Sequence, residues 1–122
     1  LGKLIERLRW ELRYSRDGWS IEAAYAKGRD IPEWFMEEPN LLPGEEFYMR
    51  SFWDLSTERQ IGMGVGPIAW SIRRFYAERA GLEECMINPF IEIIGKMDIV
   101  FMDWITAEQD RNAPKAPKRN LH

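Results

Sequence analysis

Residues 89–105 read PFIEIIGKMDIVFMDWI, and this stretch decides the fold class of the chain. Its apolar side chains recur every three or four residues, which places them along one face of an α-helix. They are Phe90, Ile93, Ile94, Met97, Phe101, Trp104 and Ile105. Pro89 suits the first position of a helix, where its missing N–H leaves no bond unmade. We therefore predict a helix that opens at Pro89 and runs to about residue 109.

Similar spacing predicts two shorter helices on the N-terminal side of this stretch. One is expected to begin at Pro67 and to stop at Gly81, because glycine readily adopts the left-handed conformation that ends a helix. The other is expected to begin at Pro43 or Gly44 and to run to about residue 58, with two glutamates in its first turn. These three helices form the predicted core.

The first residues predict a helical arm. Residues 1–14 have one apolar face, and Asp17 and Gly18 are expected to end that helix. Ser20 then suits the N-cap of a second short helix over residues 21–27, which Gly28 would terminate. Strand-like alternation is absent from the sequence. We predict an all-α fold: a small bundle of about three core helices with an N-terminal helical arm.

Changes in composition divide the chain into three parts. Residues 1–39 are the predicted arm and residues 40–109 the helical core. Residues 110–122 hold two prolines, two asparagines and four basic residues with almost no apolar content, so we expect a flexible, disordered tail.

Composition excludes most catalytic chemistry. The single His, His122, is the last residue and there is one Cys, so a His-based triad, a multi-His metal site and an internal disulfide are excluded. We predict no catalytic residue, no cofactor and no metal. A net charge of −3 argues against a nucleic-acid partner, and no apolar run is long enough to span a membrane. With a charged N-terminus that does not resemble a signal peptide, we expect a cytoplasmic protein that binds other molecules.

Carboxylates supply the enzyme alternative, which we rank last. A small hydrolase would have to use Glu45 or Asp98. We expect Glu45 to lie in the first turn of a helix. Asp98 flanks the apolar face of the last helix, where we expect an ordinary ion pair with Arg73 or Arg74.

The loop GMGVGP at residues 62–67 has three interpretations. It could cradle a phosphate, but the residues before it look helical and no Lys or Ser/Thr follows at the spacing of a nucleotide-binding loop. It could be a tight turn that needs glycine for backbone reasons. It could also be a patch with small side chains on which a partner's backbone lies. For that third interpretation the candidate protein-binding residues are Arg59, Gly62, Met63, Gly64, Gly66 and Pro67.

Six tryptophans are many for a domain of this size. We expect at least two of Trp53, Trp70 and Trp104 to lie in the bundle core. Trp10, Trp19 and Trp34 belong to the arm, which is too thin to bury them easily. Because tryptophan is a favoured interface anchor, these three are the further candidates for partner contact.

Charge is unevenly distributed along the chain. Residues 1–16 hold five basic and two acidic side chains, whereas residues 33–58 hold seven acidic side chains and one basic. Such halves attract each other within one chain or between copies, so the arm could also make a homo-oligomer.

Residues 52–70, FWDLSTERQIGMGVGPIAW, resemble small proteins of tailed-phage and prophage morphogenesis modules, the phage tail assembly chaperones. The later IIGKMD at 93–98, followed by Phe101 and Trp104, resembles the last helix of the same family. The resemblance covers residues 47–104 and leaves the arm unmatched.

This resemblance implies a non-enzymatic protein that binds the tape-measure protein and tail-tube subunits during tail assembly. Two other functions stay open on the sequence. One is a structural virion component, such as a tail or head-completion protein, and the other is a small phage-encoded inhibitor of a host enzyme.

Overall fold

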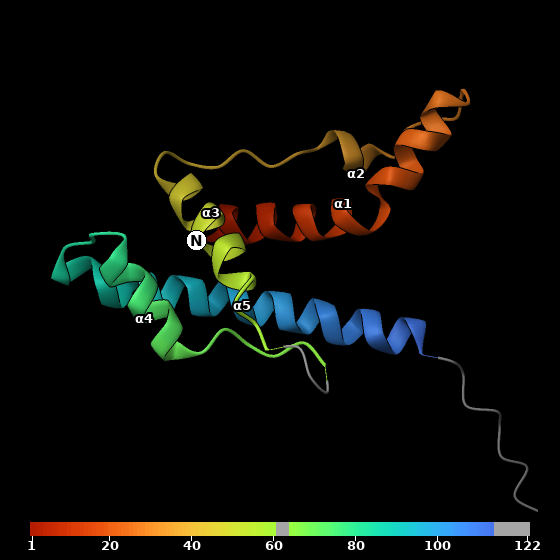
Figure 1. Ribbon diagram of the computed structural model, residues 1–122. Helices are drawn as coiled ribbons and strands as arrows, with labels where there is room; N and C mark the ends of the chain where they lie inside the picture. The colour runs from red at the N-terminus through yellow and green to blue at the C-terminus, as the bar shows by residue number, and fades with distance from the viewer. Residues whose placement is uncertain (61–63, 114–122) are drawn as a thin grey trace, which may run out of the picture.

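The computed structural model describes residues 1–60 and 64–113, and these residues form helices and connecting segments without a β-strand. The all-α prediction is therefore confirmed. Figure 1 shows the arrangement of the five helices. They are α1 (Gly2–Ala26), α2 (Glu33–Met36), α3 (Glu45–Ser56), α4 (Trp70–Arg79) and α5 (Glu84–Asn112).

Helix α5 is the central element, since it contacts α1, α3 and α4 (Figure 1). Its buried side chains include Ile87, Ile91, Ile94 and Met97, which recur at the spacing of one helix face. Phe90 is fully buried, and its ring centroid lies within 6 Å of those of three aromatic side chains. These are Phe47 and Tyr48 of α3 and Tyr76 of α4. The aromatic group thus joins three helices at one point of the core.

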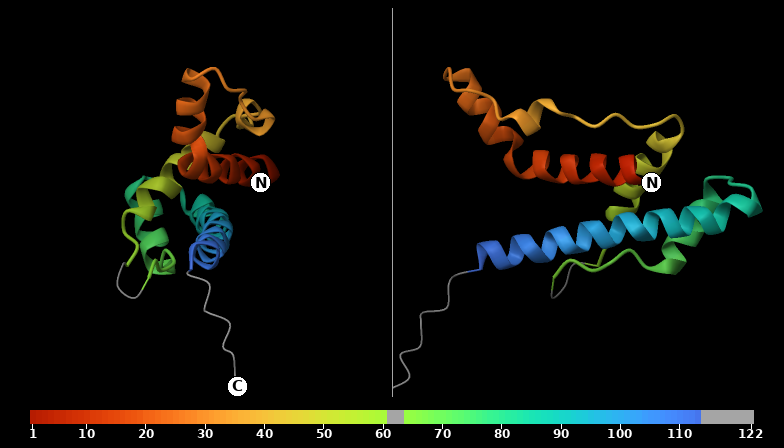
Figure 2. Two further views of the ribbon diagram at one scale, coloured as in Figure 1. Left: turned by 90° about the vertical axis from the view of Figure 1, so that its right-hand side faces the viewer. Right: turned by 180° about the vertical axis from the view of Figure 1, so that it is seen from behind.

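The first half of the arm packs on the core. Leu4, Leu8 and Leu12 follow one another at intervals of four residues, and all three are buried in the same hydrophobic cluster as α3 and α5. The expected break at Asp17 and Gly18 is wrong, because α1 continues to Ala26 and Ser20 caps no second helix. Figures 1 and 2 instead show the last part of α1 bending away from the axis of the first part.

Glycine permits two features of α1. A Cβ on buried Gly18 would lie 3.2 Å from the Tyr14 ring, so glycine allows this close packing without a shift of Tyr14. Gly28 has a φ of 83° and follows the end of the helix, as the sequence predicted. The connection between α2 and α3 then runs back along α1 (Figure 1), where Arg7 Nη1 donates to the carbonyl of Pro39 over 3.1 Å.

Neither Pro67 nor Pro89 is the first residue of its helix. Helix α4 begins at Trp70, because residues after Pro67 stay extended as far as Ala69. Helix α5 begins at Glu84, five residues before Pro89, and ends at Asn112 rather than near residue 109. A proline inside a helix forfeits one hydrogen bond, and here the buried Ile87 and Phe90 on either side of Pro89 offset that loss. The tail prediction for residues 114–122 falls outside the described residues.

Truncation of Leu8 tests whether the arm is part of the folded core. Leu8→Ala removes a fully buried side chain, so we expect the free energy of unfolding to fall by about 2–5 kcal/mol in urea denaturation. Leu42→Ala is the matched control, since Leu42 is exposed and should change stability by less than about 0.5 kcal/mol. Equal stability of the two variants would show that α1 is not docked in solution.

Candidate functional site

Arg59 and Asp98 form an ion pair in the interior. Arg59 follows α3 and Asp98 lies on α5, and their side chains are only 3% and 7% exposed. Nη2 of Arg59 lies 2.5 Å from Oδ1 of Asp98. Two charges taken out of water are stable only when each is compensated, so this pair strongly constrains how α3 and α5 meet.

The same two side chains hold the extended segment between α3 and α4. Oδ2 of Asp98 accepts a hydrogen bond from the backbone N–H of Ile68 over 2.9 Å. Nη1 of Arg59 donates to the carbonyl of Gly66 over 3.1 Å. Two backbone groups of residues 66–68 are therefore satisfied by the ion pair. We call this arrangement, formed by Arg59, Asp98, Gly66 and Ile68, the Arg59 clasp.

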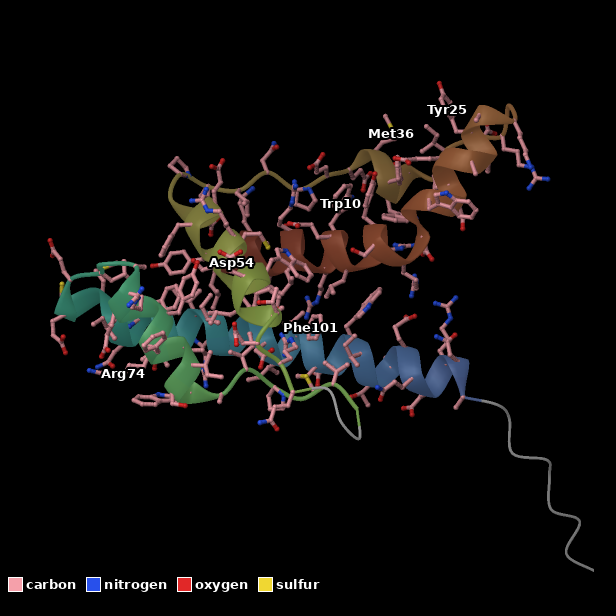
Figure 3. The ribbon with its side chains drawn as sticks, viewed as in Figure 1. Trp10, Tyr25, Met36, Asp54, Arg74 and Phe101 are labelled. Carbon is pink, nitrogen blue, oxygen red and sulfur yellow. The ribbon has the colours of Figure 1, made fainter. Side chains whose placement is uncertain are left out.

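Aromatic rings complete the surroundings of Arg59. Its guanidinium carbon lies 3.9 Å from the ring centroid of Phe101 and 5.6 Å from that of Phe52. Nη2 also donates to the hydroxyl of Ser56 over 3.3 Å. Guanidinium groups stack favourably on aromatic faces, and the stacking is worth more where water is excluded. Figure 3 shows Phe101 on α5.

The predicted partners of Asp98 were wrong. Arg73 lies against α5 about two helical turns before Asp98. Its Nη1 donates to the carbonyl of Ile91 over 2.8 Å. Arg74 pairs with Glu78 of its own helix, with 2.9 Å between Nε and Oε1. The extended residues before α4 displace that helix along α5, which leaves Asp98 opposite Arg59.

Of the glycine-loop residues predicted to bind a partner, three are described and two are not. Gly64 has a φ of 139° and is exposed, and Pro67 is also exposed. The N–H of half-buried Gly66 donates to the carbonyl of Gln60 over 3.0 Å, which closes a turn. Gly62 and Met63 lie outside the described residues. The phosphate interpretation loses its basis, because Pro67 does not open a helix whose N-terminus would face the loop.

The arm tryptophans differ in their surroundings. Nε1 of Trp10 donates to the carbonyl of Trp34 over 3.1 Å, and Trp10 stacks on Tyr14 with 5.1 Å between ring centroids. The guanidinium of Arg13 lies 4.0 Å from the Trp34 ring centroid. Trp10 and Trp34 are therefore half-buried against the arm itself. Trp19 is 81% exposed and is the arm tryptophan most open to a partner.

Exposed apolar side chains gather in two further places. Tyr25 and Met36 lie with the end of α1 and with α2 at the part of the molecule that projects from the core (Figure 3). Trp70 of α4 and Ile99 of α5 are exposed and line the same hollow, whereas Phe75 of α4 is exposed at a different place. Trp70 was one of the three tryptophans considered for the bundle core, and it is exposed instead. Trp53 and Trp104 do pack against the core, as expected for two of the three.

A charged cluster joins the middle of α1 to α5. Arg16 hydrogen-bonds Asp17 and also lies 2.6 Å from Oε1 of Glu108, while its guanidinium covers the Trp104 ring at 4.8 Å. The hydrogen bond from Arg16 lowers the pKa of Asp17 below its ordinary value. Tyr14 donates to Glu22 over 2.7 Å, and this bond raises the pKa of the phenol. These contacts orient the start of the projecting part.

The part of the chain that the structure describes lacks a membrane-spanning helix and a metal-binding cluster. No helix within residues 1–60 and 64–113 is long and apolar enough to cross a membrane. The same part of the chain contains no group of three or more His, Cys, Asp or Glu side chains placed to hold a metal ion.

The chain belongs to the phage tail assembly chaperone family. The model of that family matches residues 24–103, which is well over half of the chain. The match includes both charged members of the Arg59 clasp, and it begins after Trp10 and Trp19. No curated protein and no solved structure matches the chain significantly.

Removing the guanidinium tests how much the Arg59 clasp contributes to the stability of the fold. Arg59→Met leaves Asp98 buried without its counter-charge, so we expect the free energy of unfolding to fall by about 3–5 kcal/mol in chemical denaturation. Arg50→Met is the control, because Arg50 is exposed on α3 and should change little. If Arg59→Met cost no more than Arg50→Met, the ion pair would not organise the fold.

Proposed function

We propose that this chain is a non-enzymatic, protein-binding chaperone of phage tail morphogenesis that engages tape-measure and tail-tube subunits in the host cytoplasm. The observation that carries the proposal is the family match over residues 24–103. That range contains α2 to α4, most of α5 and the buried clasp that holds them together. The tail proteins as partners, and the cytoplasm as the compartment, are the steps we add to the family assignment.

Two exposed regions support a binding role. Trp19 lies on the projecting part of α1. Its side chain is exposed, so a partner can cover it without displacing other side chains. A large aromatic side chain with only two rotatable bonds loses little conformational entropy on binding. The second region is the segment Gly64–Pro67, whose small side chains let another backbone approach closely. Arg59 would act there indirectly, by holding Gly66 in place.

The two carboxylates of the enzyme alternative are already engaged. Glu45 accepts a hydrogen bond from the backbone N–H of Leu42 over 2.7 Å at the start of α3. Asp98 is buried and bound to Arg59 and Ile68. Neither oxygen pair is presented to a substrate beside a second catalytic group, which supports a function without catalysis.

Co-expression with tail proteins tests the proposal. Tagged chain should capture the tape-measure protein, the tail-tube subunit or both, and Trp19→Ala should reduce capture about ten-fold because it removes an exposed anchor. Phe75→Ala is the matched control, since Phe75 is exposed on α4, away from both proposed contact regions. Failure of the wild-type chain to capture either tail protein would refute the proposal.

Particle composition separates the chaperone from its closest alternative. A chaperone should be absent from purified virions by mass spectrometry, whereas a structural virion component would be present in fixed copy number. Self-association through residues 1–39 stays a prediction, and light scattering of the wild type and Trp19→Ala measures it. A stable complex with a host enzyme and none with tail proteins would favour the inhibitor function instead.

A further inference from the structure

A groove of about 500 Å³ lies between α5 and the residues that lead into α4. Figure 1 shows this connecting segment running alongside α5 and leading into α4, which continues toward the N-terminal end of α5. The side chains that matter for the argument are Pro67, Trp70, Arg73, Glu92, Lys96 and Ile99. The groove begins at Pro67, so it continues the Gly64–Pro67 contact region.

The walls of the groove are apolar and open to solvent. Trp70 is 54% exposed and Ile99 is 63% exposed, and Pro67 is exposed beside them. Three large apolar side chains that line one concavity form a site in which a partner's apolar side chain would be desolvated. The aromatic ring of Trp70 also provides a rigid wall for such a side chain.

Arg73 gives the groove an uncompensated positive charge. Five arginines in the described residues are at least half-buried, and the other four each pair with a carboxylate. Those four are Arg7, Arg16, Arg59 and Arg74. Arg73 has only the carbonyl of Ile91 as a partner, and its buried Nε donates to nothing in that part of the chain. A half-buried guanidinium without a counter-charge favours an anionic ligand.

The remaining charges around the groove leave that positive charge in excess. Lys96 is exposed and forms no ion pair within residues 1–60 and 64–113. Of the two acidic residues, Glu92 is exposed, and Asp98 is already neutralised by Arg59. Gly95 lets Arg73 take its position, because a Cβ there would collide with Nη1 of Arg73. The glycine therefore leaves room for the guanidinium against α5 at the groove.

We propose that this groove binds a segment of a tail protein in which a large apolar side chain lies next to a carboxylate. The apolar side chain packs between Trp70 and Ile99, and the carboxylate faces Arg73 and Lys96. This inference rests on the proposed function, since it names the surface and the chemistry by which a tail protein is held. It assigns the groove to a heterologous partner and not to a second copy of the chain.

Peptide binding to the full-length chain tests the groove. The probes are labelled 15-residue peptides that tile the tape-measure and tail-tube proteins, together with a displayed library of random peptides. The tightest binders in both sets should carry Asp or Glu within a few residues of Leu, Ile, Phe or Trp. Trp70→Ala and Lys96→Glu should each weaken their binding at least about ten-fold in fluorescence anisotropy.

Matched controls separate groove contacts from general effects. Phe75→Ala removes an exposed aromatic ring of the same helix outside the groove, and Arg50→Glu reverses an exposed charge on α3 outside both the groove and the Trp19 region. Both controls should bind within about two-fold of the wild type. Changing the peptide's carboxylate to lysine should weaken binding to the wild type and restore binding to Lys96→Glu. Circular dichroism checks that every variant remains helical.

Three results would overturn the groove assignment. They are wild-type affinity in both Trp70→Ala and Lys96→Glu, selected peptides without a carboxylate, and a lower oligomer mass for Trp70→Ala by light scattering. The last result would give the groove to a second copy. If whole tail proteins bind wild type and both variants equally, the groove assignment fails and the proposed function stands. If tail proteins never bind but library peptides follow the rule, the proposed function fails and the groove stands.

Discussion

The buried ion pair between Arg59 and Asp98 is the constraint on which the arrangement of α3, α4 and α5 depends. Each charge would be strongly unfavourable in the interior without the other. The chain just after α3 is therefore held where Arg59 meets Asp98 of α5. The pair also binds the backbone at Gly66 and Ile68, which brings the connecting segment against α5 in an extended form. Helix α4 can then begin only at Trp70, and its position along α5 follows from that start.

This position of α4 determines which side chains are exposed. Had α4 begun at Pro67, its first turn would include the residues that now form the wall of the groove. Because the segment stays extended, Trp70 and Ile99 remain at the surface, and Arg73 lies over Gly95 with no carboxylate partner among residues 1–60 and 64–113. The same interactions that stabilise the bundle therefore create the surface that we assign to a partner. The arm adds a second exposed region at Trp19, held in orientation by the Arg16 cluster.

Local sequence patterns predicted where most helices lie and which glycines follow them. The repeats of three and four apolar residues identified α3, α4 and α5, and the left-handed glycines Gly28 and Gly81 follow helices as expected. Local patterns were less reliable for where helices begin and end. Ser20 had the chemistry of an N-cap, yet α1 continues through it to Ala26. Pro89 had the chemistry of a first residue, yet the buried Ile87 extends α5 in front of it.

The candidate site follows the same division. The sequence alone pointed to residues 59–67 and to the arm tryptophans, because glycine spacing and an excess of aromatic side chains are visible without coordinates. It could not show that Trp10 bonds the carbonyl of Trp34 while Trp19 stays open, since that depends on how α2 returns to α1.

By itself, the sequence determined the fold class, most of the helices and the residue types that set this chain apart from a His-dependent enzyme. Only the tertiary structure decided which arginine meets Asp98. A pairing across 39 residues depends on where two helices cross, and no local spacing contains that information. The exposure of Trp70 and the position of Arg73 over α5 follow from that crossing, because the extended segment held by Arg59 and Asp98 sets where α4 begins.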